Sequence, residues 1–163
     1  MVSKYYLGID TSNYTTSVAL IDENNNILVD LRRVLKVKKG QRGLRQQEAV
    51  FQHINNMSVL IEEMSKLVDV YNIDTVSCSS RPRNLPDSYM PVFMVGKQQA
   101  LIISNLLKTK FREYSHQEGH IAAGVMNRNL ALCKKFLSFH ISGGTSELLL
   151  ISNENKKLDI KII

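Results

Sequence analysis

The sequence predicts an α/β protein: a mixed sheet with an antiparallel meander and helices on both faces, followed by the first hairpin of a second, similar unit. Segments typical of strands and helices follow one another as three strands, helix, strand, helix, strand, helix and three strands, an order that forms such a sheet. The opening pattern of strand, polar loop, strand, Asn-containing turn and strand returns near the end of the chain. We expect a first domain over residues 1–135 and a second, incomplete one over residues 136–163.

The first three strands form the meander. An apolar strand over Tyr5–Asp10 is followed by a polar stretch and by a second strand over Ser17–Asp22. Residues 23–26 read Glu-Asn-Asn-Asn, and asparagine tolerates the left-handed backbone that a tight turn needs. The third strand is predicted from Ile27 to about Val37.

Apolar spacing and one proline predict the helices. Between Gln46 and Tyr71, apolar residues recur at intervals of four and three, which places one stripe against a core. Pro91 suits the first turn of a second helix that ends near Thr109, and a third runs from Gln117 to about Cys133. The stripe of the first helix consists of Val50, Ile54, Met57, Ile61, Met64, Val68 and Tyr71. The remaining strands are predicted at Ile73–Ser79, Arg112–Ser115, Phe136–Ile141, Ser146–Ser152 and Leu158–Ile163.

Composition restricts the classes of protein to which the chain can belong. Its 163 residues are 44% hydrophobic and 22% charged, which argues against disorder and against a coiled coil. No apolar run is long enough for a transmembrane helix, and the N-terminus lacks the apolar stretch of a secretory signal. Cys78 and Cys133 are too few for a disulfide framework and suggest a reducing compartment. We therefore expect a cytoplasmic protein with no membrane partner.

The segment from Arg32 to Arg45 contains seven lysines and arginines and no acidic residue. Gly40 and Gly43 mark its second half as a loop. Two interpretations stay open. One is a solvated loop, and the other is a contact to nucleic-acid phosphates, where lysine and arginine displace counterions.

The repeated hairpins indicate a phosphate clamp. Each loop between the first two strands of a repeat offers backbone N–H groups and small hydroxyls, such as those of Thr11 and Ser12. Asp10, at the end of the first strand, could hold a metal–phosphate or polarise a water molecule as a catalytic residue, or it could simply cap the strand. The second hairpin carries Ser142-Gly143-Gly144-Thr145 as its loop.

Two histidines stand four residues apart in the sequence His116-Gln117-Glu118-Gly119-His120. At a helix start this spacing puts both imidazoles on one face, where they could bind one metal ion. A third ligand would be needed, and neither His53 nor His140 has an obvious reason to lie nearby. The alternative is two unrelated polar residues at a helix N-terminus.

Three segments together resemble one family. LGIDTSNYTTSVALID, HQEGHIAAG and FHISGGTSELLLI, in this order, are similar to the opening hairpin, the histidine motif and the second hairpin of the threonylcarbamoyl-adenosine tRNA transferases, long called glycoproteases. The resemblance covers Leu7 to about Ile151. It implies the fold of the ribonuclease H-like, actin-like ATPase superfamily, seen here as the N-terminal part of a divergent member.

The resemblance also implies a reaction and its participants. The family transfers threonylcarbamoyl from an adenylate to an adenosine next to the anticodon of some tRNAs. One divalent ion, iron or zinc, would be bound by His116 and His120. An adenine nucleotide (threonylcarbamoyl-adenylate or ATP) and tRNA would be ligands, and a paralogous actin-like subunit and an ATPase would be partners, with homo- or heterodimers possible. The residues expected to line the substrate or nucleotide site are Thr11, Ser12, His140, Ile141, Ser142, Gly143, Gly144 and Thr145.

Several positions depart from the family's pattern. Tyr14 and Thr15 stand where the family usually has two acids, and Asp10 stands where it commonly has glutamate. The glycine-rich loop of the family reads Ser79-Ser80-Arg81-Pro82-Arg83 here, and Thr145 replaces a histidine or asparagine. The family's third metal ligand is an aspartate near the end of its second domain, a region that these 163 residues do not include. We expect the isolated chain to be inactive.

Two other functions stay open. The missing loop acids and the added arginines favour a catalytically weak paralogue that acts as a binding or scaffold protein. The old family name suggests a metalloprotease, but the histidine pair lacks the adjacent general base that zinc hydrolysis uses.

Overall fold

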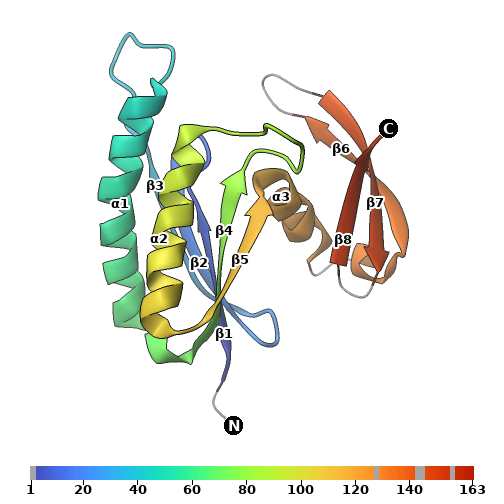
Figure 1. The fold of residues 1–163 in the computed structure, drawn as a ribbon, viewed down its shortest axis with the longest axis horizontal. Coiled ribbons are helices and arrows are strands. Elements are labelled where there is room, and N and C mark those ends of the chain that lie inside the picture. Colours follow the sequence, from blue (N-terminus) through green and yellow to red (C-terminus); the bar gives the residue numbers. More distant parts are fainter. Residues whose placement is uncertain (1–2, 127–128, 142–145, 155–156) are drawn as a thin grey trace.

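The computed structural model describes residues 3–126, 129–141, 146–154 and 157–163. These residues form a five-stranded mixed sheet and a three-stranded antiparallel sheet (Figure 1). The larger sheet has the order β3-β2-β1-β4-β5, and the smaller has the order β6-β7-β8. The strands of the larger sheet are β1 (Tyr5–Asp10), β2 (Thr15–Asp22), β3 (Ile27–Val34), β4 (Ile73–Arg81) and β5 (Lys110–Ser115). Those of the smaller are β6 (Lys135–Ile141), β7 (Ser146–Glu154) and β8 (Lys157–Ile162).

The predicted meander is confirmed. β2 pairs antiparallel with both β1 and β3, while β4 runs parallel to β1 and β5 runs parallel to β4. The turn after β2 is stabilised by Asp22, whose carboxylate accepts hydrogen bonds from the backbone N–H groups of Asn24 and Asn26, both at 2.8 Å. Asn25 adopts the left-handed backbone, with φ of 64°.

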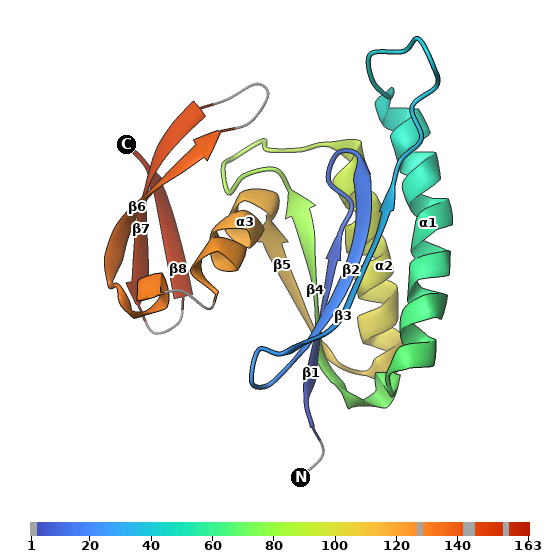
Figure 2. The same cartoon turned by 180° about the vertical axis from the view of Figure 1, so that it is seen from behind.

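Helices α1 (Gln46–Leu67) and α2 (Pro91–Leu107) cover one face of the larger sheet (Figure 2). Alternate residues of the strands point toward them and form the main core with methionines and leucines of α1. Helix α3 (His116–Val125) lies on the opposite face of the sheet. The strand residues that point to this face, such as Gly8, Ala19 and Ser77, are those that alternate with the core residues. Helices on both sides of a mixed sheet agree with the predicted fold class.

The predicted apolar stripe of α1 is confirmed in part: Met57 and Met64 are buried, and Ile61 and Val68 pack against the main core. Ile54 and Tyr71 were expected in the core, but they are 48% and 86% exposed, and Tyr71 lies beyond α1 in a 3-10 helix (Val70–Asn72). The buried row is Ala49, His53, Met57, Leu60 and Met64. The row of α1 that faces the sheet includes His53, and both ring nitrogens of His53 lie within hydrogen-bond distance of Thr16 or Asn13.

Helix α3 ends earlier than predicted. It stops at Val125, where the backbone N–H of Met126 donates to the carbonyl of Ala122. Within the range that was expected to stay helical to Cys133, Asn129–Leu132 form a separate 3-10 helix. In the described ranges, no helix is long and apolar enough to cross a membrane.

The smaller sheet buries one face and exposes the other. Leu149 and Ile151 of β7 are fully buried and pack with Ile121 of α3, which joins the two sheets through α3. On β6, Leu137, Phe139 and Ile141 point outward and are 59%, 74% and 76% exposed. The smaller sheet begins at Lys135, and the division of the chain into two domains stays a prediction.

Candidate metal and ligand site

Sheet topology brings the candidate residues to one edge. Because β1, β4 and β5 run parallel, their carboxyl ends meet at the same edge of the larger sheet. Asp10 is the last residue of β1, Ser79 lies near the end of β4, and Ser115 ends β5 directly before α3. Asp10 and His116, 106 positions apart in sequence, are therefore neighbours.

The start of α3 holds His116 in place. Ser115 accepts a hydrogen bond from the backbone N–H of Glu118 at 3.2 Å, and the Glu118 carboxylate accepts one from the backbone N–H of Ser115 at 2.6 Å. This reciprocal capping box satisfies two backbone donors at the helix start. It makes His116 the first residue of α3 and places His120 one turn later on the same face.

Asp10 and the two histidines form a hydrogen-bonded chain. The carboxylate of Asp10 accepts a hydrogen bond from Nδ1 of His116 at 2.9 Å. With its proton on Nδ1, His116 presents the lone pair of Nε2, which lies 2.8 Å from Nε2 of His120. A carboxylate bonded to the far nitrogen of an imidazole is the arrangement that fixes histidine ligands in metal sites.

Asp10 is kept ionised by its neighbours. Burial on its own would raise its pKa, but hydrogen bonds from the side chains of His116, Ser12 and Ser79 outweigh burial and hold the pKa well below its usual range. Ser12 donates both its hydroxyl and its backbone N–H to the same Asp10 oxygen. Asp10 is therefore a hydrogen-bond acceptor, whereas a general acid would need a carboxyl that holds a proton near neutral pH.

A cavity of about 700 Å³ opens beside this cluster. Small residues of β1, β2 and β4, such as Gly8, Ala19 and Ser77, form its floor, and the two histidines and Asp10 line it as well. Its volume is in the range that binds small organic ligands. The small side chains at the centre of this face leave the space that a ligand would fill.

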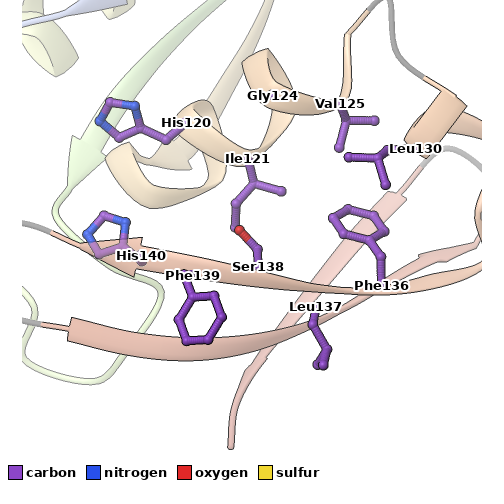
Figure 3. Close-up of a pocket in the computed structure, with 10 residues that line it drawn as sticks. All are labelled: His120, Ile121, Gly124, Val125, Leu130, Phe136, Leu137, Ser138, Phe139 and His140. Atoms are coloured by element: carbon purple, nitrogen blue, oxygen red, sulfur yellow. The ribbon is translucent and has the colours of Figure 1, made fainter.

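His140 lies closer to the histidine pair than the sequence suggested. Its ring centroid is 6.3 Å from that of His120. Figure 3 shows both side chains at one end of a second cavity of about 190 Å³ between α3 and β6, with Phe136 and Leu130 at the other. The sequence could not place His140 here, because the contact depends on how the smaller sheet packs against α3.

Thr11 and Ile141, also predicted to line the ligand site, point elsewhere. Thr11 is fully buried, and its hydroxyl donates to the carbonyl of Val92 at 2.8 Å and accepts from the N–H of Gly96 at 3.0 Å, both in α2. Ile141 is on the outer face of β6. A role of either residue in ligand binding stays a prediction, and Ser142, Gly143, Gly144 and Thr145 lie outside the described residues.

A group that sequence reasoning missed joins the two sheets at this edge. Glu147, near the start of β7, pairs with the guanidinium of Arg83 and accepts a hydrogen bond from Gln117 Nε2 at 2.9 Å. The Glu147 side chain is only 11% exposed. A buried carboxylate needs charged or hydrogen-bonding partners. A single acid at the start of an otherwise apolar strand was therefore the sequence signal for such a contact.

The donor set fits a metal ion in part. Two imidazole nitrogens converge, and a carboxylate orients one of them, which is the chemistry of a zinc or iron site. Over the parts of the chain that the structure describes, there is no group of three or more histidines, cysteines or acids arranged to bind one ion. A metal bound here would take further ligands from water, substrate or other residues.

The sequence of this chain is similar to those of curated tRNA-modifying enzymes. The chain is 29% identical to the tRNA N6-adenosine threonylcarbamoyltransferase of Thermotoga neapolitana over 155 residues, which cover 94% of the chain and 45% of that protein. It is 28% identical to the protein of the same name from Metamycoplasma arthritidis, over 95% of the chain and 47% of that protein. The chain is similar, over almost its whole length, to the N-terminal part of the tRNA N6-adenosine threonylcarbamoyltransferases. The resemblance predicted from three sequence motifs is confirmed.

The chain spans about half the length of these curated relatives. No model of a protein family matches it. Among solved structures, YeaZ from Pseudomonas aeruginosa aligns with 98% of the chain and 67% of its own length, with a TM-score of 0.54 and 11% identity. Lmo2764, a putative N-acetylmannosamine kinase from Listeria monocytogenes, aligns with 95% of the chain and 49% of its own length, with a TM-score of 0.59 and 10% identity. At such identities these structures support the actin-like ATPase fold alone.

Proposed function

We propose that this chain forms the metal-binding N-terminal part of a tRNA N6-adenosine threonylcarbamoyltransferase. The observation that carries the proposal is the convergence of Asp10, His116 and His120 at one edge of the sheet, in a chain similar to these transferases over almost its whole length. In the proposed reaction, the amine of a tRNA adenosine attacks the carbonyl carbon of threonylcarbamoyl-adenylate, and AMP leaves.

Each residue has a distinct part in the proposal. His116 and His120 bind one divalent ion, iron or zinc, and Asp10 positions His116 through its Nδ1 atom. When bound, such an ion supplies a Lewis acid that polarises the donor and a template that orients it. The cavity of about 700 Å³ beside the histidines accommodates the adenine nucleotide. Asp10 thus acts through His116 instead of touching the substrate.

The protein partners predicted from the resemblance remain part of the proposal. A paralogous actin-like subunit, an ATPase partner, and homo- or heterodimers of this chain all require an exposed surface. Apolar side chains on the outer faces of α1 and α2 support such a contact. These residues are Phe51, Ile54, Leu67, Ile102 and Leu106. A tRNA-modifying enzyme of this kind would work in the cytoplasm.

Nucleoside analysis by mass spectrometry tests the proposal. The whole gene product, loaded with iron or zinc and mixed with threonylcarbamoyl-adenylate, unmodified tRNA and its partner proteins, should yield threonylcarbamoyl-adenosine. His116→Ala and His120→Ala should each abolish the product. Asn55→Ala, at an exposed position of α1, should leave the yield unchanged. No product from the metal-loaded wild type would overturn the proposal.

A binding protein without turnover is the second candidate, and two observations favour it. Tyr14, in place of an acid, turns its hydroxyl toward Gly43, where a Cβ atom would lie 2.7 Å from it. Arg83, in place of a small residue, is fixed by Glu147. Under this alternative the protein binds tRNA and metal ions but forms no product, and introducing acids at Tyr14 and Thr15 does not create activity.

A further inference from the structure

The loop between β3 and α1 carries an excess of positive charge. It projects from the same edge of the sheet as the candidate site (Figure 1). We call residues 36–45 the basic loop. Its cations are Lys36, Lys38, Lys39, Arg42 and Arg45, all exposed. Throughout residues 3–126, 129–141, 146–154 and 157–163, none of these five forms an ion pair, whereas Arg32 and Arg33 pair with Asp30 and Glu63.

The base of the basic loop is fixed. Leu35 and Leu44, one before the loop tip and one after it, pack against Val92 and Phe93 of α2. The backbone N–H of Leu35 donates to the carbonyl of Tyr14 at 2.7 Å. Gln52 makes two hydrogen bonds with the backbone of Lys36. Its side-chain carbonyl accepts from the N–H of Lys36 at 2.7 Å, and its side-chain NH₂ group donates to the carbonyl of Lys36 at 3.0 Å. Packing and hydrogen bonds therefore hold both ends of the segment that carries these cations.

Phe93, which packs with Leu35 and Leu44, also contacts the histidine pair. The ring of Phe93 meets the ring of His116 edge to face, with centroids 6.2 Å apart. Gly43 of the basic loop lies against the hydroxyl of Tyr14, two residues after Ser12, whose hydroxyl is 3.5 Å from Nε2 of His116. The basic loop is thus connected to the candidate site indirectly, through Phe93 and through the segment after β1 that carries Ser12 and Tyr14.

We infer that the basic loop binds backbone phosphates of the RNA whose base enters the site. This inference rests on the proposed function, because an RNA substrate at the histidine pair would extend past this edge. Unpaired lysines and arginines bind phosphates by releasing counterions, without reading sequence. A membrane surface fits less well, since the basic loop has one exposed apolar side chain, Val37, while Leu44 packs against α2, and membrane-binding segments insert several.

Fluorescence anisotropy with a labelled, unmodified tRNA transcript tests the inference. The triple variant Lys38→Glu, Lys39→Glu, Arg42→Glu should weaken binding at least about tenfold near 0.1 M salt. Its plot of log affinity against log salt should be flatter by about 2 to 3, because each reversed cation no longer neutralises a phosphate. The matched control is Lys66→Glu, Lys108→Glu, Lys110→Glu, which reverses three charges at the opposite end of the sheet and helices. The control should bind within about twofold of the wild type.

Zinc titration and thermal unfolding of the same variants separate the possible causes of failure. Both triple variants should bind zinc as the wild type does, because the reversed side chains are outside the core. The basic-loop variant should also unfold as the wild type does, whereas the control loses the exposed ion pairs of Lys66 with Glu62 and of Lys110 with Asp74 and should unfold slightly earlier. Equal loss in both triple variants, or tRNA binding unchanged by reversal in the basic loop, would overturn the inference. Stronger binding to phosphatidylserine vesicles than to tRNA would overturn it in favour of a membrane. None of these three results depends on transfer activity, which tests the proposed function separately.

Discussion

Thr11 joins the end of β1 to the first turns of α2 through a single hydroxyl group. Its Oγ1 donates to the carbonyl of Val92 and accepts from the N–H of Gly96, two groups that lie four residues apart in α2. In a regular helix such groups bond to each other. The hydroxyl reaches them because Gly96 has no side chain: a Cβ there would stand 2.8 Å from Oγ1 and 3.4 Å from Ile9.

Gly96→Ala should therefore destabilise the protein by about 1–3 kcal/mol, the usual cost of overpacking a core. The matched control is Gly119→Ala in α3, where the new methyl group would meet no described atom within 4 Å outside its chain neighbours and the helix's own backbone. That variant should be neutral or gain up to about 1 kcal/mol from helix propensity. Urea unfolding of both variants measures the difference. Equal stability of the two would show that the approach of Thr11 to α2 does not restrict residue 96.

At the scale of elements, α1 is tied to the β1–β2 loop by a buried polar network. His53 is fully buried, and its Nδ1 lies 2.8 Å from the hydroxyl of Thr16. Its Nε2 lies 3.2 Å from the carbonyl of Asn13, which can only accept. In its neutral form His53 carries the proton on Nε2 and accepts a hydrogen bond from the Thr16 hydroxyl at Nδ1. Burial lowers the pKa of His53 below its ordinary 6.5.

This network makes stability depend on pH. Below about pH 6.5 the unfolded chain takes up a proton at His53 that the folded chain does not, so the free energy of unfolding should fall as the pH drops from 7 to 5. The slope from one such group is at most about 1.4 kcal/mol per pH unit. His53→Gln, which keeps a donor and an acceptor without titrating, should flatten the dependence. The hypothesis fails if urea unfolding gives the same slope for both proteins.

The elements show which features were predictable from sequence. The apolar strands, the Asn-rich turn and Pro91 predicted β1 to β3 and the start of α2, because these signals are local. The buried row of α1 was predictable only in part: the apolar spacing predicted Met57 and Met64, but not His53, a polar residue whose ring is buried against Thr16 and Asn13. The spacing of His116 and His120 predicted a shared face, but the bond to Asp10 and the approach of His140 depend on packing between distant segments.

At the scale of the whole molecule, the two sheets are joined beside the candidate site. Glu147 of β7 is bound by Arg83 from the loop after β4 and by Gln117 of α3. The backbone N–H of Gln117 also donates to the carbonyl of Pro82 at 3.1 Å, which bonds the loop after β4 to the start of α3. The arginine that departs from the family's small residue thus fixes the smaller sheet to the larger one.

Arg83→Ala should loosen this junction, because it leaves Glu147 with one partner while the acid stays largely buried. We expect backbone amides of β6 and β7 to exchange with deuterium at least about tenfold faster, while those of β1 and β2 do not change. Arg33→Ala removes a more exposed ion pair, with Glu63 of α1, and serves as the control. Unchanged exchange in β6 and β7 would mean that packing around Ile121, Leu149 and Ile151 joins the sheets without this pair.

The most direct test concerns the metal site, on which the proposed function depends. Calorimetric titration of the metal-free protein with zinc should show one ion per chain. His116→Ala and His120→Ala should abolish that binding, and Asp10→Asn should weaken it about 10–100-fold by loosening His116 while both ligands remain. Zinc affinities of these variants equal to that of the wild type would contradict a metal site at the carboxyl edge of the sheet.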